Sequence, residues 1–274
     1  MPDHPQIDAP VTLTGLFPLD SDDEDNTEEG ANDQHNEATY EIQPVDLVDT
    51  TILIRQFDFH SHNANRIWPG TFNLAEFLLA KGENGTFSHQ WGDVLELGTA
   101  TGLLAIRLAM VSTVYSKRGT DNQCCCSTLV TSDVDDERNE VAENLIYNFS
   151  LNGYSLDKQT PPPPHVPHTW GTGWEKSVAA VAGNGNFKAR IPRRFDTIVA
   201  SDILLYVSAY PSLVKTLSEL MPPLHQTGSE APQQFIMSWN RRMKESASFF
   251  SLMEEGGFTW KHEGRCIYTF SRDQ

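Results

Sequence analysis

Short apolar runs alternate with segments of helical periodicity along the chain from about residue 46. In the first helical segment Leu74, Phe77 and Leu78 lie at i, i+3 and i+4, with Asn73 before them as a candidate N-cap. The pattern predicts strands at 51–54, 93–97, 127–131, 197–200, 235–239 and 266–270, and helices at 73–82, 103–110, 137–149, 211–220 and 244–255. Strands that alternate with helices indicate an α/β fold with a mostly parallel sheet covered on both faces.

The amino-terminal segment 1–45 lacks this periodicity and is mostly polar, with seven acids among the ten residues 20–29. Such a stretch repels itself and cannot bury enough apolar area to offset the entropy of ordering it. We therefore expect a disordered acidic tail, which is either a solvating arm or a segment that recruits a basic partner. A single domain is expected over 46–274.

A second irregular segment covers residues 155–192. It contains four consecutive prolines at 161–164 and the sequence Gly-Asn-Gly-Asn at 183–186, which is typical of loops. It is longer than most connections in a compact domain. We expect His165 and His168, which lie within it, to face solvent.

The negative charge is concentrated at one end. The formal net charge is −17, from 20 Lys and Arg against 37 Asp and Glu, yet residues 1–54 contain 14 of these acids and no Lys or Arg. The remaining chain is nearly neutral and offers no basic field for phosphates, so a dedicated nucleic-acid-binding domain is not expected. No apolar run approaches about 18 residues, and the first residues lack a secretory signal, so no membrane segment is expected either.

Three of the four cysteines are contiguous, at 124–126. Such a run does not form a familiar disulfide framework, and a reducing compartment is the simpler interpretation. No histidine at ligand spacing lies nearby, so we expect the run to pack as loop and strand and predict no metal site. We expect a cytoplasmic location, with the nucleus as an additional one.

The turn that follows the apolar run 93–97 carries the sharpest chemical signal. Its glycines would let the backbone approach a ligand at the carboxyl end of a strand. The spacing Glu96-x-Gly98-x-Ala100-x-Gly102 is not the G-x-G-x-x-G of dinucleotide-binding proteins. It resembles motif I of the Rossmann-like S-adenosylmethionine-dependent methyltransferases. The alternative is a glycine turn that binds no ligand.

Asp133 stands at the end of the next predicted strand, 31 positions after Gly102. A carboxylate in that place can accept both hydroxyls of a ribose. The alternative is a helix cap, because Glu137 and Glu140 follow.

Three further segments match in the same order: Ile67-Trp68-Pro69-Gly70-Thr71, Thr169-Trp170-Gly171, and the run from Phe195 to Tyr206. Together with the two above they resemble methyltransferase family 16, over about residues 50–270. This family includes protein-lysine methyltransferases that use S-adenosylmethionine. The resemblance implies a Rossmann-like, seven-stranded, mostly parallel sheet with helices on both faces.

The resemblance also implies roles for single residues. Trp68 would lie near the methionine end of the cofactor, Asp133 would hold its ribose, and Trp170 would pack on its adenine. The other cofactor-binding residues would be Glu96, Gly98, Thr99, Ala100, Gly102 and Ser201. Asp202 and Tyr206 would stand at the mouth that receives the acceptor, as the catalytic pair.

The sequence departs from the family pattern at two of these places. Ala100 replaces a glycine, which costs little if its φ is negative and weakens cofactor binding if its φ is positive. Three residues separate Asp202 from Tyr206, whereas the family motif usually has two.

The leading function hypothesis is therefore a protein-lysine N-methyltransferase, whose partner is a protein substrate. A small-molecule N-methyltransferase is the second hypothesis, because the motifs specify the cofactor better than the acceptor. The third is a non-catalytic binding protein that retains the fold, which only Ala100 and the shifted Tyr206 support.

Overall fold

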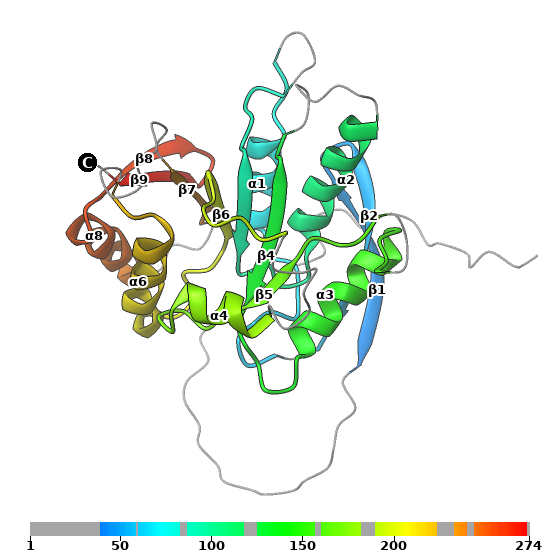
Figure 1. Cartoon of the computed structure of the whole chain (residues 1–274), viewed down its shortest axis with the longest axis horizontal. Coiled ribbons are helices and arrows are strands. Elements are labelled where there is room, and N and C mark those ends of the chain that lie inside the picture. Colours follow the sequence, from blue (N-terminus) through cyan, green and yellow to red (C-terminus); the bar gives the residue numbers. More distant parts are fainter. Residues whose placement is uncertain are drawn as a thin grey trace, which may run out of the picture.

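The computed structural model describes residues 39–58, 60–82, 87–117, 125–156, 160–181, 190–223, 233–239 and 244–272 of the chain. Figure 1 shows a central twisted sheet with helices on both sides. The strands are β1 (Tyr40–Leu47), β2 (Thr50–Phe57), β3 (Asp93–Leu97), β4 (Thr128–Asp133), β5 (His165–Pro167), β6 (Thr197–Ser201), β7 (Gln234–Ser238), β8 (Phe258–Gly264) and β9 (Ile267–Arg272). The α-helices are α1 (Gly70–Leu78), α2 (Leu103–Lys117), α3 (Glu140–Leu151), α4 (Trp174–Val181), α6 (Tyr210–Leu220) and α8 (Ala247–Glu255).

The main sheet has seven strands in the order β5-β4-β3-β6-β7-β9-β8. The first five run parallel to their neighbours, and β9 pairs antiparallel with both β7 and β8. The central strands β3, β4 and β6 are almost continuously buried, as expected for parallel strands covered on both faces. The predicted α/β fold with a mostly parallel seven-stranded sheet is confirmed.

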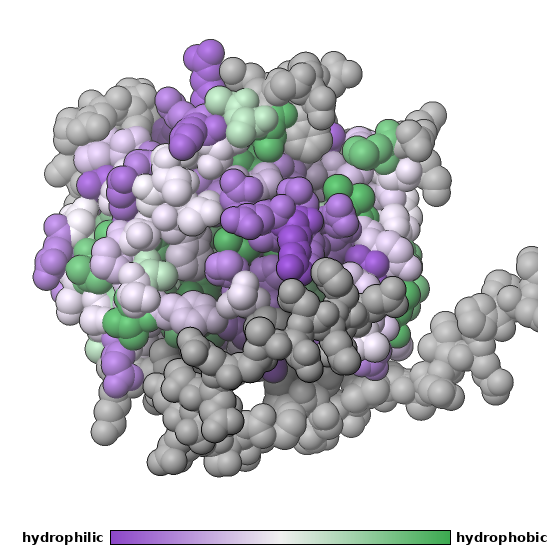
Figure 2. Space-filling view, turned by 90° about the horizontal axis from the view of Figure 1, so that it is seen from below, coloured by the Kyte–Doolittle hydropathy of each residue, from purple (hydrophilic) through white to green (hydrophobic). Residues whose placement is uncertain are grey.

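Two hydrophobic cores lie on opposite faces of the sheet. One core contains residues of α1, α2, α3 and the separate hairpin β1–β2, and the other contains residues of α4, α6 and α8. Strands β3 and β6 contribute alternate residues to each core, Val94 to the first and Leu95 to the second, for example. The face of the molecule in Figure 2 is mostly hydrophilic, with hydrophobic residues in small groups.

Helix α3 attaches the hairpin β1–β2 to the domain. Asn144 and Asn148 lie four residues apart on one face of this helix, and the C-cap residue Asn152 follows them four residues later. Asn152 Oδ1 accepts the backbone N–H of Leu53 at 3.1 Å, and Asn148 Oδ1 accepts that of Arg55 at 2.7 Å. On the edge of β2 that faces away from β1, backbone N–H groups thus donate to asparagine side chains of α3 and its C-cap.

Three local predictions were wrong. Helix α1 begins at Gly70, after Pro69, so Asn73 lies inside the helix and is not its cap. The segment 155–192 is not only loop, because it contains β5 and α4. His165 and His168 do not face solvent.

The reason is that β5 adds to the sheet edge. His165 Nε2 is buried and its Nδ1 lies 3.1 Å from Thr131 Oγ1. His168 is 1% exposed and its ring nitrogens contact Ser177 Oγ and Thr216 Oγ1 at 2.8 and 3.1 Å. Burial lowers the pKa of both imidazoles, that of His165 to about 4.

The acidic tail expected at 1–45 lies mostly outside the described residues, and the boundary expected at residue 46 falls within β1. Of the cysteine run, Cys124 lies outside the described residues, while Cys125 and Cys126 are buried and not joined in a disulfide. Within the described ranges, no helix is long and apolar enough to cross a membrane, and no group of three or more His, Cys, Asp or Glu side chains could hold a metal ion.

Candidate functional site

A cavity of about 290 Å³ opens at the carboxyl ends of β3, β4 and β6. This is where ligands bind in open α/β sheets, because the loops after the parallel strands converge there. The lining residues that the sequence predicted are Trp68, Gly98, Ala100, Asp133, Trp170, Ser201, Asp202 and Tyr206. The structure therefore brings together eight residues from five separate segments of the chain around one chamber.

The turn after β3 needs left-handed backbone at three positions. Gly98 has φ +68°, Ala100 +47° and Gly102 +83°. A side chain at Gly98 would meet Ile203 at 2.8 Å, and one at Gly102 would meet Leu145 at 2.3 Å. Gly102 therefore serves the packing of α2 on α3, and it lines neither this cavity nor the smaller one beside it. Ala100 occupies a conformation that costs an alanine about 1 kcal/mol relative to glycine.

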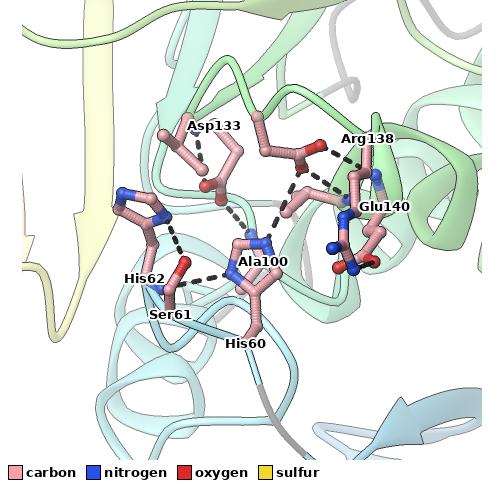
Figure 3. A network of polar contacts seen from close by, with 10 residues as sticks. His60, Ser61, His62, Ala100, Asp133, Arg138 and Glu140 are labelled. Atoms are coloured by element: carbon pink, nitrogen blue, oxygen red, sulfur yellow. Dashed lines mark hydrogen bonds and ion pairs between the residues drawn. The ribbon is translucent and has the colours of Figure 1, made fainter. Parts of the chain in front are cut away.

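Asp133 ends β4 and turns its carboxylate toward the glycine turn (Figure 3). Oδ2 accepts the backbone N–H of Ala100 at 2.6 Å, and Oδ1 accepts that of Val134 at 2.7 Å. Burial raises the pKa of Asp133, while these hydrogen bonds and the nearby imidazoles of His60 and His62 act in the opposite direction. Asp133 is not the cap of α3. Asp136 has that role, because its carboxylate accepts the N–H groups of the first two helical residues.

Glu96 lies beneath the turn and is 2% exposed. It lines a small adjoining cavity of about 10 Å³ together with Thr99 and Trp68. Burial, with the nearby charge of Asp133, raises the pKa of Glu96 well above its ordinary value. Its Oε2 has no hydrogen-bond partner among the described residues. A buried acceptor without a partner is costly, so this atom suits a donor from a bound ligand.

Thr99 does not face the main cavity. Its backbone N–H donates to the carbonyl oxygen of Ser132 at 3.1 Å, and its Oγ1 accepts the backbone N–H of the same residue at 3.2 Å. Thr99 therefore holds the turn against the end of β4, and it contributes to the site through the backbone.

Asp202 follows β6 and is 2% exposed, with φ +50°. Its Oδ2 accepts the backbone N–H of Gly70 at 2.5 Å, and Ser238 Oγ donates to the carbonyl oxygen of Gly70 at 2.7 Å. A side chain at Gly70 would lie 2.7 Å from this Oδ2. The first turn of α1 thus holds the Asp202 carboxylate, while Ser238 at the end of β7 holds Gly70 and accepts the backbone N–H of Asp202 at 2.9 Å.

Tyr206 reaches the cavity despite the extra residue in its motif. The backbone turns directly after Asp202, and the ring of Tyr206 lines the outer part of the chamber while 46% of the residue stays exposed. Ser201 lies deeper, with its Oγ 3.0 Å from Thr71 Oγ1. The predicted acceptor pair thus shares one cavity.

The sequence did not reveal the wall formed by His62, Asn63 and Ala64. These residues precede Trp68, whose Nε1 donates to the carbonyl oxygen of Asn63 at 3.0 Å. The only hint in the sequence was the residue type at position 63, because asparagine is among the few residues that readily adopt left-handed backbone. Asn63 does so, with φ +56°.

The donors and acceptors around the cavity fit S-adenosylmethionine. Each carboxylate oxygen of Asp133 accepts one backbone N–H and has a second lone pair for a ribose hydroxyl. Trp170 supplies a flat apolar surface for a base. The unpartnered Glu96 Oε2 provides an acceptor in the small adjoining cavity, which Trp68 also lines.

Comparisons with known proteins agree with this fit. A family model for methyltransferase family 16, described as lysine methyltransferase, matches residues 184–256. The chain is also 29% identical, over 158 residues, to the protein-lysine N-methyltransferase EFM3 of Chaetomium thermophilum. The resemblance to methyltransferase family 16 is confirmed. That alignment covers 57% of this chain and 38% of the relative, so the chain spans well under half of the relative's length.

Solved structures with a similar arrangement include a putative SAM-dependent methyltransferase from Streptococcus mutans, with 11% identity over 84% of this chain and 55% of that chain, at a TM-score of 0.47. The T. thermophilus 16S rRNA methyltransferase RsmC, in complex with AdoMet and guanosine, is 15% identical over 86% of this chain and 51% of that chain, at a TM-score of 0.46. The family match over residues 184–256 supports S-adenosylmethionine as the cofactor predicted from the sequence.

Proposed function

We propose that this chain is a protein-lysine N-methyltransferase that uses S-adenosylmethionine. The observation that carries the proposal is the shared cavity, which Asp133 and Asp202 line from the carboxyl ends of β4 and β6, on either side of β3. A family match described as lysine methyltransferase supports a lysine side chain as the acceptor, and hence a protein substrate.

The residues that would hold the cofactor are those the resemblance named. Asp133 would accept the ribose hydroxyls, Trp170 would cover the adenine, and Glu96 would accept from the methionine end. Gly98 would let the cofactor approach the backbone, and Ala100 would place one methyl group beside it. When bound, S-adenosylmethionine supplies a methyl group activated by a sulfonium.

The chain's own contribution is to prepare the acceptor. A lysine ammonium has an ordinary pKa of roughly 10.4 and must lose a proton before it can attack. Apolar cavity walls such as Ile203 and Leu205 disfavour the charged form and so lower that pKa. Asp202 and Tyr206 would orient the amine, since in-line transfer depends on alignment. No residue is assigned as a dedicated general base.

A cytoplasmic location, with the nucleus as an additional one, belongs to the same proposal. Cys125, Cys126 and Cys266 are not joined in disulfides, which supports a reducing compartment.

The test is incubation of the purified chain with methyl-labelled S-adenosylmethionine and a cell extract, followed by separation of proteins from small molecules. We expect label in a discrete protein band, at lysine, that Asp202→Ala abolishes. Asp133→Ala should weaken cofactor binding about 10- to 100-fold, because charge-assisted hydrogen bonds are lost. Asp46→Ala, at an exposed position on the hairpin, is the matched control and should change neither.

Two outcomes would contradict the proposal. Label confined to the small-molecule fraction would indicate a small-molecule N-methyltransferase. An absence of both label and measurable cofactor binding would indicate a non-catalytic protein that retains the fold.

A further inference from the structure

The segment 60–65, between β2 and α1, is anchored at both ends beside the cavity. His60 is 6% exposed, packs edge-on against Phe57 at 6.0 Å between ring centroids, and places Nε2 3.7 Å from the Asp136 carboxylate. At the other end Asn65 Nδ2 donates to the carbonyl oxygen of Phe57 at 2.8 Å. Both anchors involve Phe57, so the segment forms a short closed strap, which we define as residues 60–65.

The middle of the strap faces the cavity. His62 lies on the side of Asp133 (Figure 3), and its Nδ1 is 3.1 Å from Ser61 Oγ. Its backbone N–H donates to His60 Nδ1 at 3.3 Å, which connects the centre of the strap to its buried anchor. The strap is therefore a wall of the chamber with its own internal bonds.

Asn63 connects this wall to the opposite one. Its Nδ2 donates to the hydroxyl of Tyr206, which follows β6 and lies 143 positions away in the sequence. Its carbonyl oxygen accepts the indole N–H of Trp68 at 3.0 Å. One residue thus contacts the aromatic residue at the acceptor mouth and the one at the inner end of the cavity.

A conformational role alone does not account for this arrangement. Asn139 has nearly the same backbone, with φ +55° against +56° for Asn63, and its side chain makes no capping hydrogen bond. Left-handed backbone therefore does not require the side-chain contact that Asn63 makes. The amide of Asn63 serves the cavity and not only the turn.

We propose that Asn63 is a further residue of the cofactor site, whose amide joins the strap to Tyr206 across the cavity and so retains the bound cofactor. The inference rests on the proposed function, because it requires a cofactor in this chamber. Asn63 acts as a positioning residue. Its amide holds Tyr206, whose hydroxyl also makes a longer contact of 3.4 Å with the carbonyl oxygen of Ser61 in the strap, and its carbonyl oxygen holds Trp68. Release of the cofactor then requires the bond between Asn63 and Tyr206 to break.

The test is a double-mutant cycle on the dissociation of S-adenosylhomocysteine from the full chain, followed by tryptophan fluorescence because Trp68 and Trp170 line the cavity. Asn63→Gly removes the amide and tolerates the left-handed backbone. Tyr206→Phe removes the hydroxyl from the other side. Asn139→Gly and Tyr147→Phe are matched controls at a left-handed asparagine and a partly exposed tyrosine outside the cavity.

We expect each variant of the pair to release S-adenosylhomocysteine about fivefold faster, the effect of one lost hydrogen bond. The double variant should also be about fivefold faster, and not the roughly 25-fold of independent effects. The controls should match the parent chain. Unaltered dissociation, or multiplied effects in the double variant, would overturn the role of Asn63 and leave the methyltransferase proposal standing. Failure of the parent chain to bind S-adenosylhomocysteine would overturn both.

Discussion

The carboxylate of Asp133 accepts its hydrogen bond from the backbone N–H of Ala100, at 2.6 Å, while Ala100 has φ +47°. The strained conformation and the hydrogen bond go together, because left-handed backbone at this position directs the N–H toward the end of β4. The chain thus pays about 1 kcal/mol to hold Asp133 in place with an alanine.

Replacing Ala100 by glycine should relieve this strain. We expect Ala100→Gly to raise the free energy of unfolding by about 0.5–1 kcal/mol, and to keep or strengthen cofactor binding because a methyl group is removed from the cavity wall. Chemical denaturation and a cofactor titration would measure the two effects. Ala105→Gly, inside α2, is the matched control and should destabilise by about 1 kcal/mol. A less stable Ala100→Gly variant would refute the strain argument.

Glu96 should make the cofactor-free protein less stable as the pH rises. The pKa of Glu96 is higher in the folded protein than in the unfolded chain. Above pH 4.5 the folded protein therefore binds more protons than the unfolded chain, and its free energy of unfolding falls as the pH rises toward the folded pKa. Glu96→Gln removes this penalty. We expect the variant to gain stability relative to the parent at pH 8, to lose that gain near pH 4, and to bind cofactor more weakly. Denaturation curves at both pH values that differ by the same amount would contradict this account.

His165 should act in the opposite direction in acid. The pKa of His165 falls from 6.5 to about 4 on folding. Between these pH values the unfolded chain binds more protons than the folded protein, so the free energy of unfolding decreases as the pH falls. The loss amounts to at most about 3 kcal/mol. We expect His165→Gln to flatten the dependence of unfolding free energy on pH between 6.5 and 4, whereas His262→Gln, at an exposed site on β8, should leave it in place. Identical curves for the two variants would argue against burial of His165 as the cause.

Gly70 should tolerate no side chain. A methyl group there would lie 2.6 Å from Ser238 Oγ and 2.7 Å from Asp202 Oδ2, so Gly70→Ala must displace the Asp202 carboxylate. We expect a loss of about 1–3 kcal/mol in stability and a larger fall in methyl transfer than in cofactor affinity. Gly256→Ala, whose nearest neighbours lie at 3.3–3.4 Å and whose φ is negative, is the control for a glycine-to-alanine change. Full transfer by Gly70→Ala would show that Asp202 need not be fixed.

The central part of the fold was predictable because its signals are local. The apolar run of β3 leads directly into glycines whose φ values are positive, and the amino acids that form the turn are adjacent in the sequence. The apolar run of β6 likewise leads directly into Asp202, which follows it in the sequence. Strands β1 and β8 were missed because most of their residues are exposed, and only Val45 and Leu47 of β1 and Phe258 of β8 are buried, which is too few to form a clear alternation.

The missed site residues depend on contacts that are distant in the sequence. Asn63 contacts Tyr206, 143 positions away, and no periodicity encodes such a pair. His165 and His168 are buried because β5 pairs in parallel with β4. The proline-rich sequence around β5 does not predict a strand. The sequence could not tell whether φ of Ala100 is positive or negative, and only the structure shows that it is positive.

Helix α3 governs the cofactor chamber from a distance. Its asparagines hold β2, which leads into the strap, and Asp136 at its start faces His60 within that strap. Leu145 on the same helix is the side chain that Gly102 makes room for. Unwinding of α3 would therefore loosen the hairpin, the strap and the glycine turn together, so the stability of this one helix limits how firmly three walls of the chamber are held.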